Sequence, residues 1–175
     1  MKPFKQGNLD RFCSVYSVLN SMQLLGINLP YYKAQEMYDY IIDQLNMYDS
    51  FFDTAENGAD YKRLEQIMSY AKEYVKTVFK AELSYHRPFY NKKLFFDEIV
   101  NYMQTQRNAG KSVIIRVRSN EFDHYSVFYG VNEKRIRLFD SDVLPSIKLN
   151  QISHIKNDAK YQLLIRQMYV LELYK

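Results

Sequence analysis

The sequence predicts an α+β fold in which helices come first and a mainly antiparallel sheet follows. Up to about Gly110, apolar residues recur at the three- and four-residue spacing of amphipathic helices. After Gly110 the pattern changes to short β-branched and aromatic runs separated by turn residues, and this order is typical of α+β domains. The 175 residues suit one hydrophobic core and contain no repeat or Pro/Gly-rich linker, so we expect a single domain over residues 1–175.

Four helices are expected in the first part of the chain. The first begins at Cys13, has apolar residues along one face and is followed by Gly26, a residue type that commonly ends helices. The fourth begins at Asn91, a residue type favoured at helix N-caps. The predicted helices cover about residues 13–25, 33–45, 60–71 and 91–110.

Four strands are expected after Gly110, and one less regular strand before it. The segment Asn-Glu-Lys at residues 132–134 separates two strand-like runs and predicts a hairpin turn. The predicted strands cover residues 77–83, 112–117, 124–131, 135–140 and 168–173.

Composition excludes several classes of protein. Hydrophobic residues make up 47% of the chain and charged residues 25%, which is the balance of a folded domain and not of a disordered one. The net charge of +4 is small and the basic residues are scattered, so no nucleic-acid partner is expected. We expect no membrane span, because no uncharged apolar run approaches ~20 residues. Residues 1–12 lack a signal-peptide core and a single cysteine needs no oxidising compartment, which favours a cytoplasmic location.

Cys13, the only cysteine in the sequence, opens the first predicted helix. A cysteine acts as a nucleophile in its thiolate form, which the unpaired N–H groups and the dipole of a helix N-terminus stabilise. A lone cysteine on a helix is more commonly a buried structural thiol. Its partners elsewhere in the sequence decide between these two interpretations.

Three further residues supply what a thiol nucleophile requires. Gln6 lies upstream of Cys13 and can direct its amide N–H groups at an oxyanion that forms during acyl transfer. His124 begins a predicted strand and can act as the general base. Asp140 ends the following strand and can hold the imidazole in its productive tautomer.

This set resembles the papain-like cysteine peptidases, and within them the bacterial branch that includes the double-glycine leader peptidases of bacteriocin exporters. That branch has a Gln, a Cys that opens the central helix, a His followed on its strand by an aliphatic-aromatic run and Gly, and an Asp that closes the next strand. The resemblance implies a papain-like fold with the central helix packed on the sheet. It also implies that Gln6 is the oxyanion-hole donor, Cys13 the nucleophile, His124 the general base and acid, and Asp140 its orienting residue. The resemblance covers both ends of the chain, whereas residues 27–110 match no pattern of the family.

Two departures from the family pattern affect the predicted site. Ser14 follows the nucleophile where family members usually carry Gly. Gln6 lies seven residues before Cys13, one more than is usual, and Asn8 or Asp10 in the same loop could share its role.

The hairpin after His124 provides a geometric test of this hypothesis. With a three-residue turn at residues 132–134, His124 lies opposite Asp142 and diagonal to Asp140, all on one face of the sheet. A two-residue turn would shift the register by one residue and move Asp140 to the other face. The hypothesis therefore requires the three-residue turn and leaves Asp142 as an alternative acidic partner.

The resemblance implies a cysteine hydrolase that cleaves a peptide or isopeptide bond through a thioester, with a protein or peptide as substrate. Two alternatives stay open: an acyltransferase or transglutaminase-like enzyme with the same triad, and an inactive papain-like module that binds a protein or peptide. Retention of Cys13, His124 and Asp140 together argues against the inactive module. The oligomeric state and the identity of the substrate do not follow from the sequence.

No cofactor or metal is expected. His86, in a polar loop that contains Pro, is interpreted as a surface residue and His154 as part of a loop or turn. One cysteine with scattered histidines offers no zinc-binding spacing. The acidic segment at residues 49–53 lacks the glycine and the terminal Glu of a calcium-binding loop.

Overall fold

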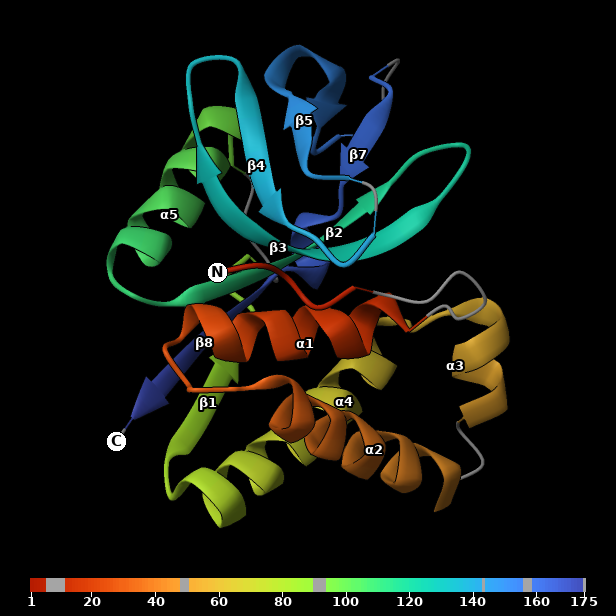
Figure 1. Cartoon of the computed structure of the whole chain (residues 1–175). Helices are drawn as coiled ribbons and strands as arrows, with labels where there is room; N and C mark the ends of the chain where they lie inside the picture. The colour runs from red at the N-terminus through yellow and green to blue at the C-terminus, as the bar shows by residue number, and fades with distance from the viewer. Residues whose placement is uncertain (6–11, 48–50, 90–93, 143, 156–158, 175) are drawn as a thin grey trace.

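The structure is a computed structural model that describes residues 1–5, 12–47, 51–89, 94–142, 144–155 and 159–174 (Figure 1). It combines helices with a mainly antiparallel sheet, which confirms the predicted α+β class. The helices are α1 (Cys13–Leu24), α2 (Tyr31–Met47), α3 (Phe51–Asn57), α4 (Tyr61–Tyr74) and α5 (Phe96–Asn108), with a π-helical turn η1 (Val75–Phe79) and two 3₁₀ turns, η2 (Leu149–Gln151) and η3 (Ile165–Gln167). The strands are β1 (Glu82–His86), β2 (Ser112–Arg118), β3 (Asp123–Val131), β4 (Arg135–Phe139), β5 (Ser146–Lys148), β6 (Ile152–Ser153), β7 (Tyr161–Leu163) and β8 (Tyr169–Tyr174).

The sheet joins the two halves of the chain. Its main order is β1-β8-β2-β3-β4-β5, and every neighbouring pair along this order is antiparallel. The short strand β7 extends the sheet by pairing with β2, and β6 runs parallel to β7. β1, the strand that follows the first four helices, pairs with the C-terminal strand β8. The helical half and the sheet half are therefore parts of one hydrogen-bonded unit.

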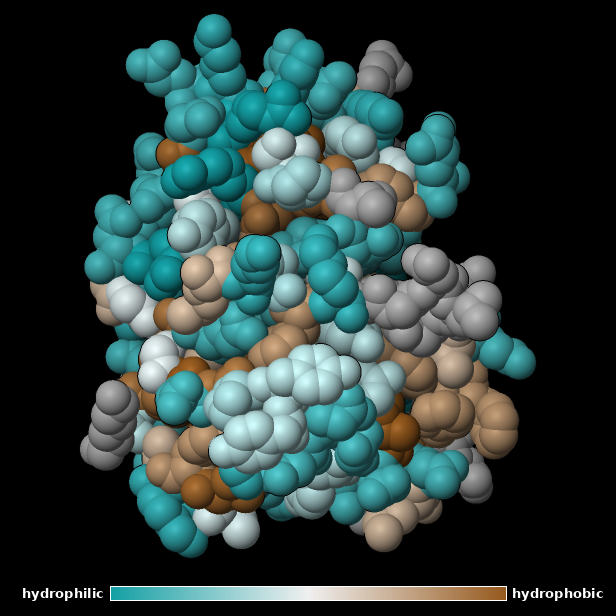
Figure 2. All heavy atoms as spheres, in the orientation of Figure 1, coloured by the Kyte–Doolittle hydropathy of each residue, from teal (hydrophilic) through white to brown (hydrophobic). Residues whose placement is uncertain are grey.

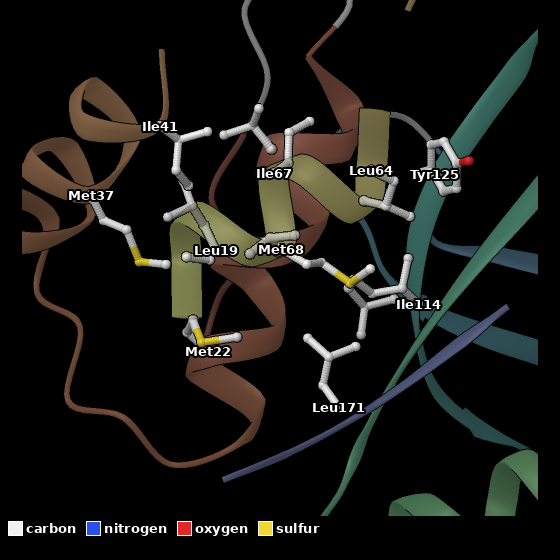
Figure 3. Close-up of a cluster of buried hydrophobic side chains, with 14 of the residues drawn as sticks. Leu19, Met22, Met37, Ile41, Leu64, Ile67, Met68, Ile114, Tyr125 and Leu171 are labelled. Carbon is white, nitrogen blue, oxygen red and sulfur yellow. The ribbon is translucent and has the colours of Figure 1, made fainter. Parts of the chain in front are cut away.

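One face of the sheet packs against α1 and α4, and α2 packs against these two helices. Figure 3 shows Leu19 of α1 and Met68 of α4 among the apolar side chains that lie between these helices and the strands. Ile114 of β2 and Leu171 of β8 close this core from the sheet side. The core fixes α1 against the middle of the sheet, so the first residue of α1 has a defined position relative to β3.

The opposite face of the sheet packs against α5. Val113 and Ile115 lie in this second core, whereas Ile114 between them lies in the first, as the alternation of side chains along a strand requires. Ile99 and Met103 of α5 are fully buried here. Because β2 is apolar on both faces, it is a central strand with helices on each side.

The predicted helices and strands are mostly present, with some differences in their bounds. Gly26 adopts a left-handed conformation (φ 82°) after α1, and Asp60 caps α4 by accepting a 2.8 Å hydrogen bond from the N–H of Arg63. The predicted start of a helix at Asn91 lies outside the described residues; α5 begins at Phe96. Its first turn is closed by the Glu98 carboxylate, which accepts a 2.7 Å hydrogen bond from the N–H of residue 95.

The prediction of one strand over residues 77–83 is wrong. The first part of this segment belongs to the π-helical turn η1, and β1 begins only at Glu82. Lys80 between them has a positive φ of 54°, which reverses the chain and ends the helix. The helix α3 and the short strands β5, β6 and β7 were not predicted, because they are too short to show a hydrophobic period.

The turn between β3 and β4 contains two residues, so the predicted three-residue turn is wrong. The N–H of Asn132 donates a 3.0 Å hydrogen bond to the carbonyl of Arg135, which leaves only residues 133 and 134 in the turn. A β-bulge between Phe128 and Gly130 then adds one residue to β3. Beyond the bulge Val127 pairs with Phe139, which is the register that the three-residue turn would have given. The bulge therefore compensates for the shorter turn at the His124 end of the strand.

Candidate active site

Cys13 is the first residue of α1, as predicted, and its side chain is buried against β3. The backbone N–H of Tyr125 points at the thiol, with 3.5 Å between the nitrogen and Sγ. The preceding residue, Phe12, is buried and makes no side-chain cap for the helix. The N-terminus of α1 and one N–H group of β3 thus converge on the sulfur atom, and both favour negative charge there.

His124 and Asp140 form a buried pair beside Cys13. Nε2 of His124 lies 2.8 Å from Oδ2 of Asp140. Cys13 lies close enough to the imidazole to help raise the pKa of His124. Cys13, His124 and Asp140, three of the four residues singled out in the sequence, therefore lie together.

The surroundings of His124 favour its protonated form. Burial alone lowers the pKa of His124, but the hydrogen bonds to Asp140 and Cys13 and the charges of these partners raise it from 6.5 to about 10. Burial raises the pKa of Asp140, whereas the hydrogen bond and charge of His124 lower it more, so that the overall pKa falls below 3.8. The two groups therefore form an imidazolium–carboxylate pair, and a positive imidazolium stabilises a thiolate next to it.

The backbone around Asp140 holds its carboxylate in place. Oδ1 accepts hydrogen bonds from the N–H groups of Asp142 (2.8 Å) and Leu144 (3.4 Å). Lys5 crosses from the N-terminal segment and donates from Nζ to the carbonyls of Asp140 (3.4 Å) and Asp142 (2.8 Å). The side chain of Asp142 is exposed, so this residue reaches Asp140 through its backbone alone.

A second polar cluster fixes both neighbours of His124. Arg116 of β2 donates two hydrogen bonds to Asp123, with Nε–Oδ1 at 2.6 Å and Nη2–Oδ2 at 3.0 Å. Its Nη1 donates to Oε1 of Gln167 (2.6 Å) and to the hydroxyl oxygen of Tyr125 (3.4 Å). Asp123 and Tyr125 flank His124 in β3, so the cluster restrains the backbone on both sides of the imidazole.

Sequence reasoning missed this cluster, although a signal for it exists. Arg116 interrupts the otherwise apolar run Val-Ile-Ile-Arg-Val of β2, and a charged side chain in a buried strand requires a partner. Lys5 gave no such signal, because its contacts are with residues more than 130 positions away.

Several buried serines lie within two residues of Cys13, His124 or Asp140 in the sequence. Ser14, which stands where the family usually has Gly, is fully buried next to Cys13. Ser126 lies close enough to Asp140 to help lower the pKa of that carboxyl, yet its hydroxyl makes no hydrogen bond of good geometry with a described residue. The hydroxyl of Ser141 is likewise buried without such a partner.

The fourth predicted residue, Gln6, lies outside the described residues, as do Asn8 and Asp10. The other two histidines lie apart from the triad: His86 is exposed at the end of β1, and His154 stacks on Phe96 with ring centroids 6.2 Å apart. Within the described ranges, no three His, Cys, Asp or Glu side chains are grouped so that they could hold a metal ion.

No protein-family model matches the sequence, and a search of curated proteins finds no match. None of the helices in the described part of the chain combines the length and apolarity needed to cross a bilayer.

Proposed function

We propose that this protein is a cysteine hydrolase that cleaves a peptide or isopeptide bond, with Cys13 as nucleophile, His124 as general base and acid, and Asp140 as the residue that orients His124. The observation that supports this most strongly is the buried group of thiol, imidazole and carboxylate, in which His124 contacts Asp140 and the neighbouring Tyr125 N–H faces the thiol. The proposal includes the papain-like fold and the cytoplasmic location that were expected from the sequence.

In the proposed reaction, the Cys13 thiolate attacks the carbonyl carbon of the substrate and a C–S bond forms. His124, protonated at the nitrogen that faces the thiol, gives this proton to the leaving amine as the C–N bond breaks. A thioester on Cys13 remains. His124 then takes a proton from water, the resulting hydroxide attacks the thioester, and the C–S bond breaks to release the carboxylic acid and restore the thiolate.

In this scheme the contact between His124 and Asp140 determines which ring nitrogen of His124 exchanges protons with the thiol. The carboxylate occupies Nε2, so the opposite nitrogen is the one that exchanges protons with the thiol. The N–H of Tyr125 supplies a hydrogen bond to the sulfur when it is negative. Stabilisation of the oxyanion by Gln6 is proposed from the family resemblance alone.

Labelling by iodoacetamide tests the thiol directly, because Cys13 is the only cysteine in the chain. At neutral pH Cys13 should be labelled faster than the thiol of a short unstructured peptide, because the imidazolium of His124 stabilises the reactive thiolate. His124→Ala should slow the labelling. His86→Ala, a matched change of an exposed histidine, should leave the labelling profile unchanged. An unreactive thiol, or one labelled no faster than the thiol of the unstructured peptide, would remove the proposal.

Turnover is tested by incubating the protein with a peptide library and identifying products by mass spectrometry, with Cys13→Ala as the blank. New carboxyl termini in the wild-type sample alone would support hydrolysis. Products that carry an added amine, when an amine acceptor is supplied, would indicate acyl transfer with the same triad. Binding of peptides without any product would indicate the inactive module.

A further inference from the structure

A group of basic residues lies on one face of β4 and β5, at the end of the sheet away from α1. Arg135 and Arg137 alternate with the buried Ile136 and therefore lie on the same face of β4. Lys148 of β5 pairs directly with Arg135 and shares this face. With Lys134 from the hairpin turn, these residues form what we call the basic face: Lys134, Arg135, Arg137 and Lys148. Hydrophilic side chains cover this end of the molecule (Figure 2).

The basic face carries charge that its own neighbours do not neutralise. Arg135 and Lys148 stand directly opposite each other, and like charges in this arrangement are destabilising. Within the described residues, none of the four makes an ion pair; Arg135 donates from Nε to the neutral hydroxyl of Ser146 at 2.8 Å. Strands that keep such a pair without a carboxylate partner are suited to a negatively charged ligand.

Three of these four residues line a hollow. A cavity of about 390 Å³ is lined by Lys134, Arg135 and Lys148 together with Leu149, Asn150 and one acidic residue, Glu133. Three cations therefore face one carboxylate across a space large enough for side chains of a partner. The cavity is shaped by backbone contacts, since the N–H of Leu149 donates a 2.9 Å hydrogen bond to the carbonyl of Lys134.

A tyrosine continues the basic face towards the candidate active site. Tyr129, at the bulge in β3, is 43% exposed and is covered by two guanidinium groups, with Arg137 at 5.5 Å and Arg107 at 6.0 Å from its ring centroid. Its ring stacks on Phe139, with ring centroids 5.8 Å apart. Phe139 is buried and immediately precedes Asp140, so the strand that carries Arg135 and Arg137 leads towards the candidate active site.

The length of β4 gives the distance between the basic face and the candidate active site. From Arg135 to Phe139 there are four residues of extended strand, which is about 13 Å at ~3.3 Å per residue. An extended peptide covers the same length with about four residues.

We propose that the basic face is a docking site for an acidic segment of the polypeptide substrate, which lies along β4 while the bond to be cleaved lies at Cys13. The inference rests on the proposed hydrolase function. It adds a substrate class, namely polypeptides with several Asp or Glu residues about four to six positions from the cleaved bond. A peptide fits better than a nucleic acid, because the cations follow one extended strand that leads into a site for acyl chemistry.

The first test is binding, measured with Cys13→Ala so that it does not depend on catalysis. A fluorescent oligo-glutamate peptide is titrated at low salt and followed by anisotropy. The variant Lys134→Gln/Arg137→Gln/Lys148→Gln removes three charges from exposed positions and leaves Arg135 with Ser146. The control Lys62→Gln/Lys72→Gln/Lys76→Gln removes the same charge from exposed lysines of α4 and η1.

We expect the basic-face variant to bind oligo-glutamate about tenfold more weakly or worse, and the control to bind like the parent protein. Equal weakening in both variants would overturn the proposal, because the attraction would then be that of net charge alone. Tighter binding of an oligothymidylate of equal charge would also overturn it, in favour of a nucleic-acid surface. Circular dichroism of both variants checks that they fold.

A second arm connects docking to cleavage. Among peptides cleaved by the wild-type protein, those with acidic residues about four to six positions from the cleaved bond should show a raised KM and an unchanged kcat in the basic-face variant. Cleavage with no such preference would overturn the docking proposal and leave the hydrolase proposal standing. If the protein binds oligo-glutamate selectively but its thiol proves unreactive, the hydrolase proposal is overturned and the basic face remains a docking site for acidic peptides.

Discussion

The backbone N–H of Asp142 donates a 2.8 Å hydrogen bond to Oδ1 of Asp140. In the register of the strands, Asp142 would be an equally good acidic partner for His124. The structure gives it a different relationship, in which its backbone supports the Asp140 carboxylate and its own side chain is exposed. The two aspartates are therefore distinguishable by mutation.

Asp140→Asn should reduce turnover by orders of magnitude, towards the ~10⁴-fold loss known for neutralised triad acids in serine proteases. The loss follows because the amide NH2 of Asn can donate to Nε2 of His124, which favours the tautomer that carries its proton on Nδ1. Asp142→Asn keeps the backbone N–H that binds Asp140 and should cost much less. The measurement is kcat/KM for a cleaved peptide, with circular dichroism as a check on folding. Similar losses in both variants would show that Asp140 is wrongly assigned.

The sequence singled out Cys13, His124 and Asp140, which the structure brings together, but did not predict the way in which they meet. The positions of Cys13 at a helix start and of His124 at a strand start follow from local patterns, and both are confirmed. The proximity of His124 to Asp140 depended on the strand register. The register near His124 was predicted correctly but for the wrong reason. The turn has two residues and not three, and a bulge in β3, which no hydrophobic period reveals in the sequence, compensates for the missing residue.

The hydrophobic pattern of the sequence does not predict very short elements or contacts between distant parts of the chain. β5 and β7 contain three residues each, and α3 contains seven, so none shows a period. The cluster of Arg116, Asp123 and Gln167 joins parts of the chain whose contact depends on the pairing of β2, β3 and η3. Only the isolated arginine in an apolar strand indicated that some partner had to exist.

Arg116 should behave as a positioning residue. Arg116→Lys keeps the charge but loses the two-point contact with Asp123, and Arg116→Gln loses both, so the backbone around His124 is held less firmly. We expect kcat to fall by about 10–100-fold in Arg116→Gln with little change in KM, and less in Arg116→Lys. Iodoacetamide labelling of Cys13 at neutral pH should also become slower.

Arg118→Gln provides the control for Arg116. Arg118 contacts the same Asp123 but is half exposed, and its ion pair is open to solvent. It should therefore change kcat less than twofold, as is usual for surface ion pairs. If Arg118→Gln lowered kcat as much as Arg116→Gln, the charge of Asp123 and not the hydrogen bonds of Arg116 would control the site.

Stability should depend on pH through His124. Its pKa is raised in the folded protein to about 10, so the stabilisation is complete below the unfolded value of 6.5 and is lost as the pH rises towards 10. The pKa of Asp140 is lowered, so its contribution is present above 3.8 and is lost as the pH falls below that value. The pair should therefore stabilise the fold most between about pH 4 and 6.5.

This dependence is measured by urea unfolding of the wild type and Asp140→Asn at several pH values. The difference in unfolding free energy between them should shrink by about 1–3 kcal/mol from pH 6 to pH 10, since each pKa unit corresponds to about 1.4 kcal/mol. A difference that stays constant over this range would mean that the pair does not form as a charged pair.

Asn20 of α1 connects this helix to the N-terminal segment. It is fully buried and binds the N-terminal segment at both backbone groups of Phe4: Oδ1 accepts from the N–H at 2.7 Å, and Nδ2 donates to the carbonyl at 3.3 Å. Asn20→Ala leaves both groups of Phe4 without these partners, which should lower the free energy of unfolding by about 1–3 kcal/mol.

The neighbouring Ser21 is the matched control for Asn20. It is equally buried in α1, but its hydroxyl makes no hydrogen bond with a described residue. Ser21→Ala removes a buried hydroxyl that gains nothing from burial, so urea unfolding should show unchanged or higher stability. Asn20→Ala should also slow turnover, because Phe4 and Lys5 connect α1 to the loop of Asp140 and that connection would be weakened. Equal stability of the two variants would show that the N-terminal segment is held by other contacts, and that Lys5 reaches the Asp140 loop without help from Asn20.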